Sequence, residues 1–312
     1  SELDHRERTG DEVVVSAVTF GERDAFPLAA PPRATGWRAY VRGVVAELGA
    51  EDILLAPAEI GIDSDLVTGA GLSSSAALEV SLALAMIELG RPGATQEIDR
   101  IALARLCSRA ESEWAGAMTG LLDQLASLFG RSGAAVLIDF ATLAIEAVPV
   151  PLAGWRLAVV DSGDRHSHES SGYNERRAEC ARACELLGLR YLSEASAERA
   201  GELPEPLRSR TLHVVGENER VAGAVRALRA ADMPALGALL DAAHASARDL
   251  FDVSTPAVER TVELLHAWGA AGARLTGGGF GGSVLGLFGP GVSLPAAARE
   301  VRPSAGARLL DG

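Results

Sequence analysis

The chain has 312 residues, of which 48% are hydrophobic and 23% charged; this length allows two domains with their own cores and argues against extensive disorder. The formal net charge of −13 argues against a nucleic-acid partner, because that affinity depends on clustered positive charge. The three cysteines, Cys107, Cys180 and Cys184, lack CxxC spacing, which indicates reduced buried thiols. We recognise no signal peptide or spanning segment and expect a cytoplasmic protein with no membrane partner.

The first half alternates predicted strands and helices. Residues 1–10 are polar and do not open a domain, so we expect preceding sequence. The patterns then predict strands at 12–18, 59–62, 134–139 (a buried run) and 155–160, and helices at 37–48, 78–89, 95–111 and 121–128. Gly90 is expected to stop the second helix and Thr95 to cap the third. Pro149 and Pro151 precede the fourth strand, and we place a domain boundary there.

The second half is predicted to be richer in helix. Helices are expected at 173–187, 217–230, 234–250 and 256–267, and a strand at 284–288. Pro234 and Pro256 suit the first turn of their helices, because proline lacks the N–H that this position leaves unpaired.

Residues 67–77 read Val-Thr-Gly-Ala-Gly-Leu-Ser-Ser-Ser-Ala-Ala and lead into a predicted helix. A Gly-rich turn with hydroxyls at a helix start supplies close backbone approach, N–H donors and the positive end of the helix dipole, which favour phosphate binding. An N-cap run on an ordinary core helix is the alternative. A Walker loop is excluded because the sequence has no lysine, and Glu79 and Glu88 exclude a membrane span.

A second Gly-rich run, residues 275–283, reads Leu-Thr-Gly-Gly-Gly-Phe-Gly-Gly-Ser. Gly277, Gly279 and Gly282 formally satisfy GxGxxG, but a strand rather than a helix is predicted after them, so we reject a dinucleotide fingerprint. A plain hairpin needs only one or two glycines, so we expect another loop or a ligand to approach this run closely.

With both runs placed, the chain from residue 37 onward resembles the GHMP kinases and, within them, the galactokinases. The motifs that carry the resemblance follow the family's order: Gly69–Ala77, Ala110-Glu111, Gly120–Gln124, Leu137–Asp139, Arg165–Ser167, Ser170–Tyr173, His213–Glu217, Asp252–Pro256 and Thr276–Gly282. Each motif is weak alone, whereas their order and spacing together are specific.

The resemblance implies a two-domain α+β fold. It places an N-terminal domain like the ribosomal S5 domain 2 at residues 1–154 and a ferredoxin-like C-terminal domain at residues 155–312, with the active site between them. It also implies transfer of the ATP γ-phosphate to the C1 hydroxyl of galactose, with Mg²⁺ as cofactor. We expect galactose and ATP as small-molecule partners and a monomer.

The resemblance assigns roles to individual residues. Asp123 matches the active-site aspartate, Gly120 and Tyr173 match sugar-contacting positions, and Ser75 and Glu111 match the Mg²⁺ ligands. Gly69, Ala70, Gly71, Leu72, Ser73, Ser74 and Ser75 match the nucleotide loop, and Gly277, Gly278, Gly279 and Gly281 a supporting loop.

Each of these residues also has an ordinary structural reading. Asp123 could cap a helix or pair within the core, and Glu111 could be a solvated carboxylate near a helix end. Tyr173 could be a buried core side chain and Gly120 a turn residue.

The chain departs from the family in one respect: the first galactokinase signature, which supplies an arginine and the Glu, His and Asp that hold sugar hydroxyls, has no match here. One alternative is another GHMP sugar kinase, such as one for N-acetylgalactosamine, because the sequence does not reveal an acetyl pocket. The other is a binding-only sensor of sugar and nucleotide, which replacement of the signature arginine would favour. The alternating His166 and His168 could suggest a metal site, but two such histidines are weak support.

Overall fold

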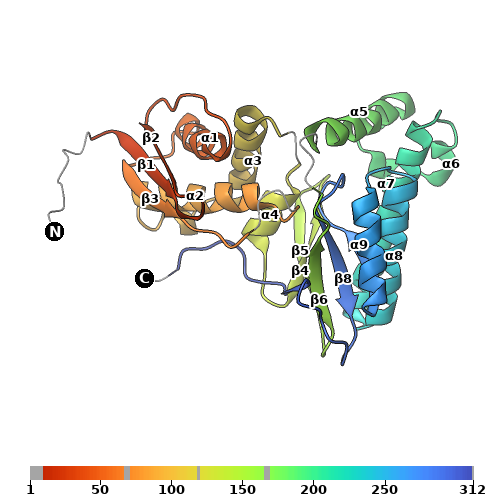
Figure 1. The fold of residues 1–312 in the computed structure, drawn as a ribbon. Coiled ribbons are helices and arrows are strands. Elements are labelled where there is room, and N and C mark those ends of the chain that lie inside the picture. Colours follow the sequence, from red (N-terminus) through yellow and green to blue (C-terminus); the bar gives the residue numbers. More distant parts are fainter. Residues whose placement is uncertain (1–9, 67–70, 118–119, 165–168, 311–312) are drawn as a thin grey trace. The chain divides into compact units, whose positions relative to one another are not determined.

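A computed structural model describes residues 10–66, 71–117, 120–164 and 169–310, and the remaining residues are drawn in grey in Figure 1. Contacts divide the chain into two compact units. The first comprises residues 1–66, 74–129 and 306–312, and the second residues 67–73 and 130–305. The predicted α+β class is confirmed. The predicted domain boundary after residue 154 stays a prediction, because contact-based units and family domains are different divisions.

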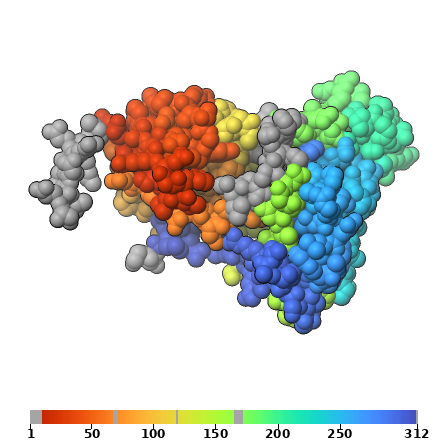
Figure 2. Space-filling model, in the orientation of Figure 1, coloured from red at the N-terminus to blue at the C-terminus, as the bar shows by residue number. Residues whose placement is uncertain are grey.

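The first unit contains a three-stranded sheet of order β2-β1-β3. Its strands are β1 (Glu12–Ala17), β2 (Glu22–Pro27) and β3 (Ala58–Ile62). β1 runs antiparallel to β2 and parallel to β3, and Val13, Val15 and Ala17 of β1 are buried. This period of two places one sheet face on the core. Residues 10–66 form one continuous red and orange body in the space-filling view (Figure 2).

Helices pack together in the same unit (Figure 1). They are α1 (Trp37–Ala50), α2 (Ser74–Gly90), α3 (Arg100–Ala110) and α4 (Leu122–Phe129), and the short π-helix η3 (Glu111–Ala115) continues α3. α1 approaches η3 closely because Gly43 has no side chain: a β-carbon there would lie 2.7 Å from Cγ of Trp114. This close approach holds η3 against α1.

One expectation about helix ends is confirmed and one is wrong. α2 ends at Gly90, as predicted, and a β-carbon there would lie 1.9 Å from the Leu54 carbonyl oxygen, so glycine also permits close packing. Thr95 does not cap α3; its hydroxyl donates to Glu88 at 2.8 Å. Asp99 is the cap, and its side chain accepts from the first backbone N–H groups of the helix.

The second unit contains a four-stranded antiparallel sheet of order β7-β8-β6-β9 and a separate hairpin, β4-β5. The strands are β4 (Ala134–Asp139), β5 (Ala144–Pro149), β6 (Arg156–Asp161), β7 (Ala270–Leu275), β8 (Ser283–Phe288) and β9 (Arg299–Val301). β8 follows the second Gly-rich run, as predicted. β4 was expected to be buried, but none of its residues is fully buried; it pairs only with β5, outside the four-stranded sheet.

The helices of this unit are α5 (Glu169–Leu187), α6 (Ala197–Ala200), α7 (Leu207–Arg229), α8 (Met233–Asp249) and α9 (Pro256–Ala267). α8 and α9 lie along the sheet, whereas α5 and α6 pack against α7 (Figure 1). Pro234 and Pro256 occupy first turns, as predicted, whereas α7 begins ten residues before the predicted start at residue 217. α8 and α9 both pack against β7. Within the described residues, no helix combines the length and hydropathy needed to cross a membrane.

Candidate active site

The metal ligands predicted from the sequence meet in the first unit. Ser75 lies in the first turn of α2 and Glu111 at the start of η3, and the Ser75 hydroxyl donates to Glu111 Oε1 at 2.7 Å. Glu111 is only 4% exposed, so the reading of a solvated surface carboxylate does not fit the structure. Two hard oxygen donors therefore converge from separate helical segments, which is the donor chemistry that Mg²⁺ prefers.

These two residues suit a partial rather than a complete metal site. Among the residues that the structure describes, no group of three or more His, Cys, Asp or Glu side chains could hold a metal ion. Mg²⁺ keeps several waters and is bound by one or two carboxylates together with substrate phosphates. One carboxylate and one hydroxyl fit that pattern, and they do not fit a closed zinc site.

The interior of the cluster holds two residues to which sequence reasoning assigned no role, Glu79 and Gln124. Both are fully buried. Gln124 Nε2 donates to Glu111 Oε2 at 2.9 Å and to Glu79 Oε2 at 3.1 Å. Burial, and then the charge of Glu111, raise the pKa of Glu79 to about 9, although the bond from Gln124 opposes the shift. Glu79 is therefore a neutral carboxylic acid at pH 7.

Sequence signals for these two residues were present but weak. Glu79 falls one helical turn after Ser75 and beside the buried Ala76 and Val80, so its position on the apolar face of α2 could have marked it. From the sequence, Glu79 is used only as a charged residue that excludes a membrane span. Gln124 appeared within a family motif without a role.

Asp123 and Gly120 lie at the start of α4. Asp123 is in the first turn of α4, half-buried and next to Gln124 in the chain, and its charge contributes to the raised pKa of Glu79. Gly120 is exposed, and a β-carbon there would meet no atom within 4 Å. The structure thus brings Asp123 into the same cluster as Glu79, whereas the sugar-contacting role of Gly120 stays a prediction.

The nucleotide loop is described in part. Gly69 and Ala70 lie outside the described residues, as do Arg165, His166 and His168. Gly71 and Ser73 have left-handed backbones with φ of 68° and 53°, Leu72 lies between them, and Ser74 is the first residue of α2. Seventeen residues of helix follow, so the loop leads directly to a helix N-terminus, where anions are favoured.

The supporting Gly-rich loop lies beside Gly71 in the second unit. A β-carbon on Gly277 would lie 3.3 Å from the Gly71 carbonyl oxygen, and one on Gly279 would lie 2.5 Å from Cβ of Val253. Gly277, Gly279 and Gly281 have positive φ. The prediction that another loop approaches this run is confirmed for its contacts with the segments of Gly71 and Val253.

Tyr173 lies in α5 and packs against the same loop. A β-carbon on Gly278 would lie 3.1 Å from Cδ2 of the Tyr173 ring, and one on Gly172 would lie 2.7 Å from the ring of Phe280. The side chain thus has the partly buried packing that its structural reading expects, and its sugar-contacting role stays a prediction.

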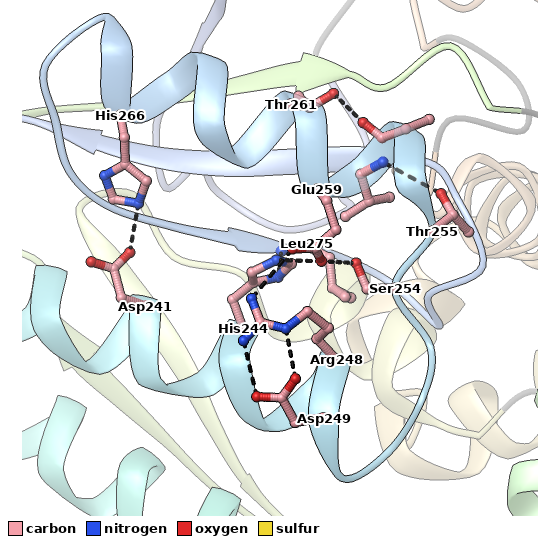
Figure 3. Close-up of polar contacts among 12 residues, drawn as sticks. Asp241, His244, Arg248, Asp249, Ser254, Thr255, Glu259, Thr261, His266 and Leu275 are labelled. Atoms are coloured by element: carbon pink, nitrogen blue, oxygen red, sulfur yellow. Dashed lines mark hydrogen bonds and ion pairs between the residues drawn. The ribbon is translucent and has the colours of Figure 1, made fainter.

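A polar network centred on His244 holds the strand that leads into this loop (Figure 3). The Leu275 N–H donates to His244 Nδ1 at 3.4 Å, so the proton lies on Nε2, which donates to Glu259 at 3.0 Å. Ser254 also donates to Glu259, and Thr255 donates to Asp164 at 3.0 Å. Burial lowers the pKa of His244. The neutral imidazole therefore connects α8, α9 and the end of β7.

The cysteines are free thiols, as predicted. Cys107 of α3 is fully buried, and this burial raises the pKa of its thiol. Cys180 and Cys184 are half-buried, and burial raises the pKa of Cys180 to about 11. Thiolate chemistry is therefore suppressed at these positions.

Comparisons with known proteins match this architecture. The GHMP kinase N-terminal domain model matches residues 39–131 and the GHMP kinase C-terminal model residues 224–307. The galactokinase of Thermotoga petrophila is 40% identical over 250 residues, which are 80% of this chain and 70% of that protein. The galactokinase of Streptomyces coelicolor is 43% identical over 265 residues, covering 82% and 67%.

A solved structure agrees with these relatives. The crystal structure of Lactococcus lactis galactokinase complexed with galactose matches with a TM-score of 0.83 and 30% identity, covering 91% of this chain and 76% of that one. A mevalonate kinase structure, at 16% identity and a TM-score of 0.59, shows the fold alone. The chain therefore belongs to the galactokinases within the GHMP kinase family.

Proposed function

We propose that this protein is a galactokinase that transfers the γ-phosphoryl group of ATP to the C1 hydroxyl of galactose. The observation that carries the proposal is the convergence of Ser75 and Glu111 at 2.7 Å in the same buried cluster as Asp123. The identity of 40% to curated galactokinases supports the sugar and the nucleotide.

Different residues have different roles in phosphoryl transfer. Asp123 engages the attacking hydroxyl, either by accepting its proton or by orienting it while charge develops on the phosphoryl group. The loop around Gly71 and the first N–H groups of α2 bind the phosphates. Gly120 and Tyr173 contact the sugar.

Ser75 and Glu111 would hold Mg²⁺. The ion, when bound, neutralises charge on the β- and γ-phosphates. Because Ser75 already donates its proton to Glu111, the hydroxyl directs lone pairs away from the carboxylate and keeps them available to a cation. The neutral state of Glu79 adds no negative charge next to these residues.

The test measures binding and turnover separately. ADP release is followed with galactose, with N-acetylgalactosamine and without sugar, and ATP-analogue and galactose binding are titrated calorimetrically. Galactose-dependent ADP release supports the proposal. Turnover of N-acetylgalactosamine alone would assign a different sugar kinase, and binding of both ligands without ADP release would assign a sensor. The monomeric state and the cytoplasm stay predictions.

A further inference from the structure

Both N–H groups of the Gln124 side-chain amide donate hydrogen bonds to carboxyl groups from two other helical segments. One N–H reaches Glu111 Oε2 at 2.9 Å and the other Glu79 Oε2 at 3.1 Å. A primary amide has two such hydrogens, so Nε2 has no donor left. Since Gln124 and Glu79 are 0% exposed, water does not compete for these bonds.

Two oxygens of this pair have no partner in the described structure, Glu79 Oε1 and Gln124 Oε1. A buried acceptor without a donor destabilises the fold, because it loses its hydrogen bond to water. A proton on Glu79 Oε1 would supply a donor where both of these oxygens are acceptors, and the two Gln124 N–H groups would stay directed at Glu79 Oε2 and Glu111 Oε2.

From this geometry we propose that Gln124 is a positioning residue, which Glu79 anchors and which in turn fixes the Glu111 carboxylate for the divalent cation. The inference rests on the proposed metal role of Glu111. Ser75 holds Oε1 of Glu111 and Gln124 holds Oε2, so donors from α2 and α4 restrain both oxygens. Residues that orient a metal ligand in this way typically contribute 10- to 100-fold in metal affinity.

A purely structural role for Gln124 makes a different prediction. If the amide only satisfied the buried carboxyl of Glu79, its loss would lower the melting temperature and leave the metal affinity of the folded protein unchanged. Metal affinity therefore separates positioning from packing, and it is measurable without turnover.

The experiment titrates Mn²⁺ into the protein in the presence of ADP and follows free Mn²⁺ by electron paramagnetic resonance, with a thermal melt of each variant. Gln124→Met, which removes both donors at similar length, should weaken Mn²⁺ binding roughly 10-fold or more. Glu79→Gln is the matched control: its amide oxygen can still accept from Gln124, and its N–H supplies a donor that the Gln124 oxygen lacks, so its Mn²⁺ affinity should stay within about 3-fold of the wild type.

Glu111→Gln distinguishes failure of this inference from failure of the proposed metal site. Weaker Mn²⁺ binding by Glu111→Gln with unchanged binding by folded Gln124→Met would overturn the positioning role alone. Unchanged binding by Glu111→Gln would overturn the metal role and the inference with it. If Gln124→Met does not fold, Glu79→Leu removes the anchor, and wild-type Mn²⁺ affinity in that variant would refute the inference.

Discussion

Gly71 and Gly277 contact each other through their backbones, and both are in the left-handed region, with φ of 68° and 80°. A β-carbon on Gly71 would also lie 3.4 Å from the Thr276 carbonyl oxygen. The nucleotide loop and the supporting loop thus approach each other at a distance that favours residues without side chains.

Gly71→Val should abolish nucleotide binding and destabilise the fold by about 1–3 kcal/mol, because a branched side chain is strained at positive φ and occupies space that the phosphates need. Calorimetric titration with an ATP analogue, run beside a thermal melt, measures both effects. Gly291→Val is the matched control, since Gly291 has φ of 82° and open space around it; it should lose stability and keep nucleotide affinity. A folded Gly71→Val protein that binds normally would contradict the phosphate-loop assignment.

Asp123→Asn should retain ATP binding and lose turnover by several orders of magnitude. The amide keeps the shape of the side chain but removes the carboxylate that engages the attacking hydroxyl. ADP release and nucleotide titration on the same preparation separate the two effects. Near-normal turnover would remove Asp123 from catalysis.

Glu111→Gln should raise the Mg²⁺ concentration needed for half-maximal turnover, because a neutral amide is a poorer ligand for a hard cation. Glu113→Gln, an exposed neighbour on the same short helix, is the control and should leave the Mg²⁺ titration unchanged. If the two variants need the same Mg²⁺ concentration for half-maximal turnover, Glu111 has a structural role and does not bind the metal.

Stability should fall with rising pH because of Glu79. Its pKa is raised from 4.5 to about 9 in the folded protein, so between those values the folded state binds more protons than the unfolded chain. The contribution of protonated Glu79 to the free energy of unfolding is complete below pH 4.5 and is lost as the pH rises toward 9. Relative to Glu79→Gln, the wild type should lose at most about 1.4 kcal/mol per pH unit across this window. Urea unfolding at several pH values measures the difference, and parallel curves for the two proteins would show that Glu79 is ionised.

Gly272→Ala should destabilise the second unit by about 3 kcal/mol or more. A β-carbon there would lie 2.1 Å from the Gly237 carbonyl oxygen, so α8 would have to move away from β7. Gly49→Ala is the opposite case: its β-carbon meets nothing within 4 Å in α1, and it should stabilise by about 0.5–1 kcal/mol. Thermal melts of both variants should shift in opposite directions, and equal shifts would argue against close helix–strand packing.

The sequence predicted elements best where one period dominated. α9 was predicted at its observed bounds because Pro256 opens it and its apolar spacing is regular, and β8 was recognised as a short apolar run. β2 was missed because its inward positions are Asp24 and Phe26, and buried Asp24 is paired with Arg42 at 2.6 Å. An ion pair on the core face removes the apolar alternation that identifies a strand.

In the candidate site, too, the residues that belong to a sequence pattern were predicted and the others were not. Ser75, Glu111 and Asp123 were found through family motifs, whereas Glu79 and Gln124 depend on a three-dimensional contact between α2 and α4 across 45 residues of sequence. The sequence marks Glu79 only weakly, by its place on the apolar face of α2, and does not show its bond to Gln124. The relation between Glu79 and Gln124 became clear only from their hydrogen bond and their unpaired Oε1 atoms.

The burial of Cys107 gives the protein a native reporter. In the folded state its thiol is both enclosed and disfavoured as a thiolate by the neighbouring acids, whereas the half-buried Cys180 and Cys184 are more accessible to a thiol reagent. The slowest-reacting thiol should therefore be Cys107, and its labelling rate measures how often α3 opens. Opening of the acid cluster can thus be followed in the unmodified chain, and ligands that close the cluster should slow that rate.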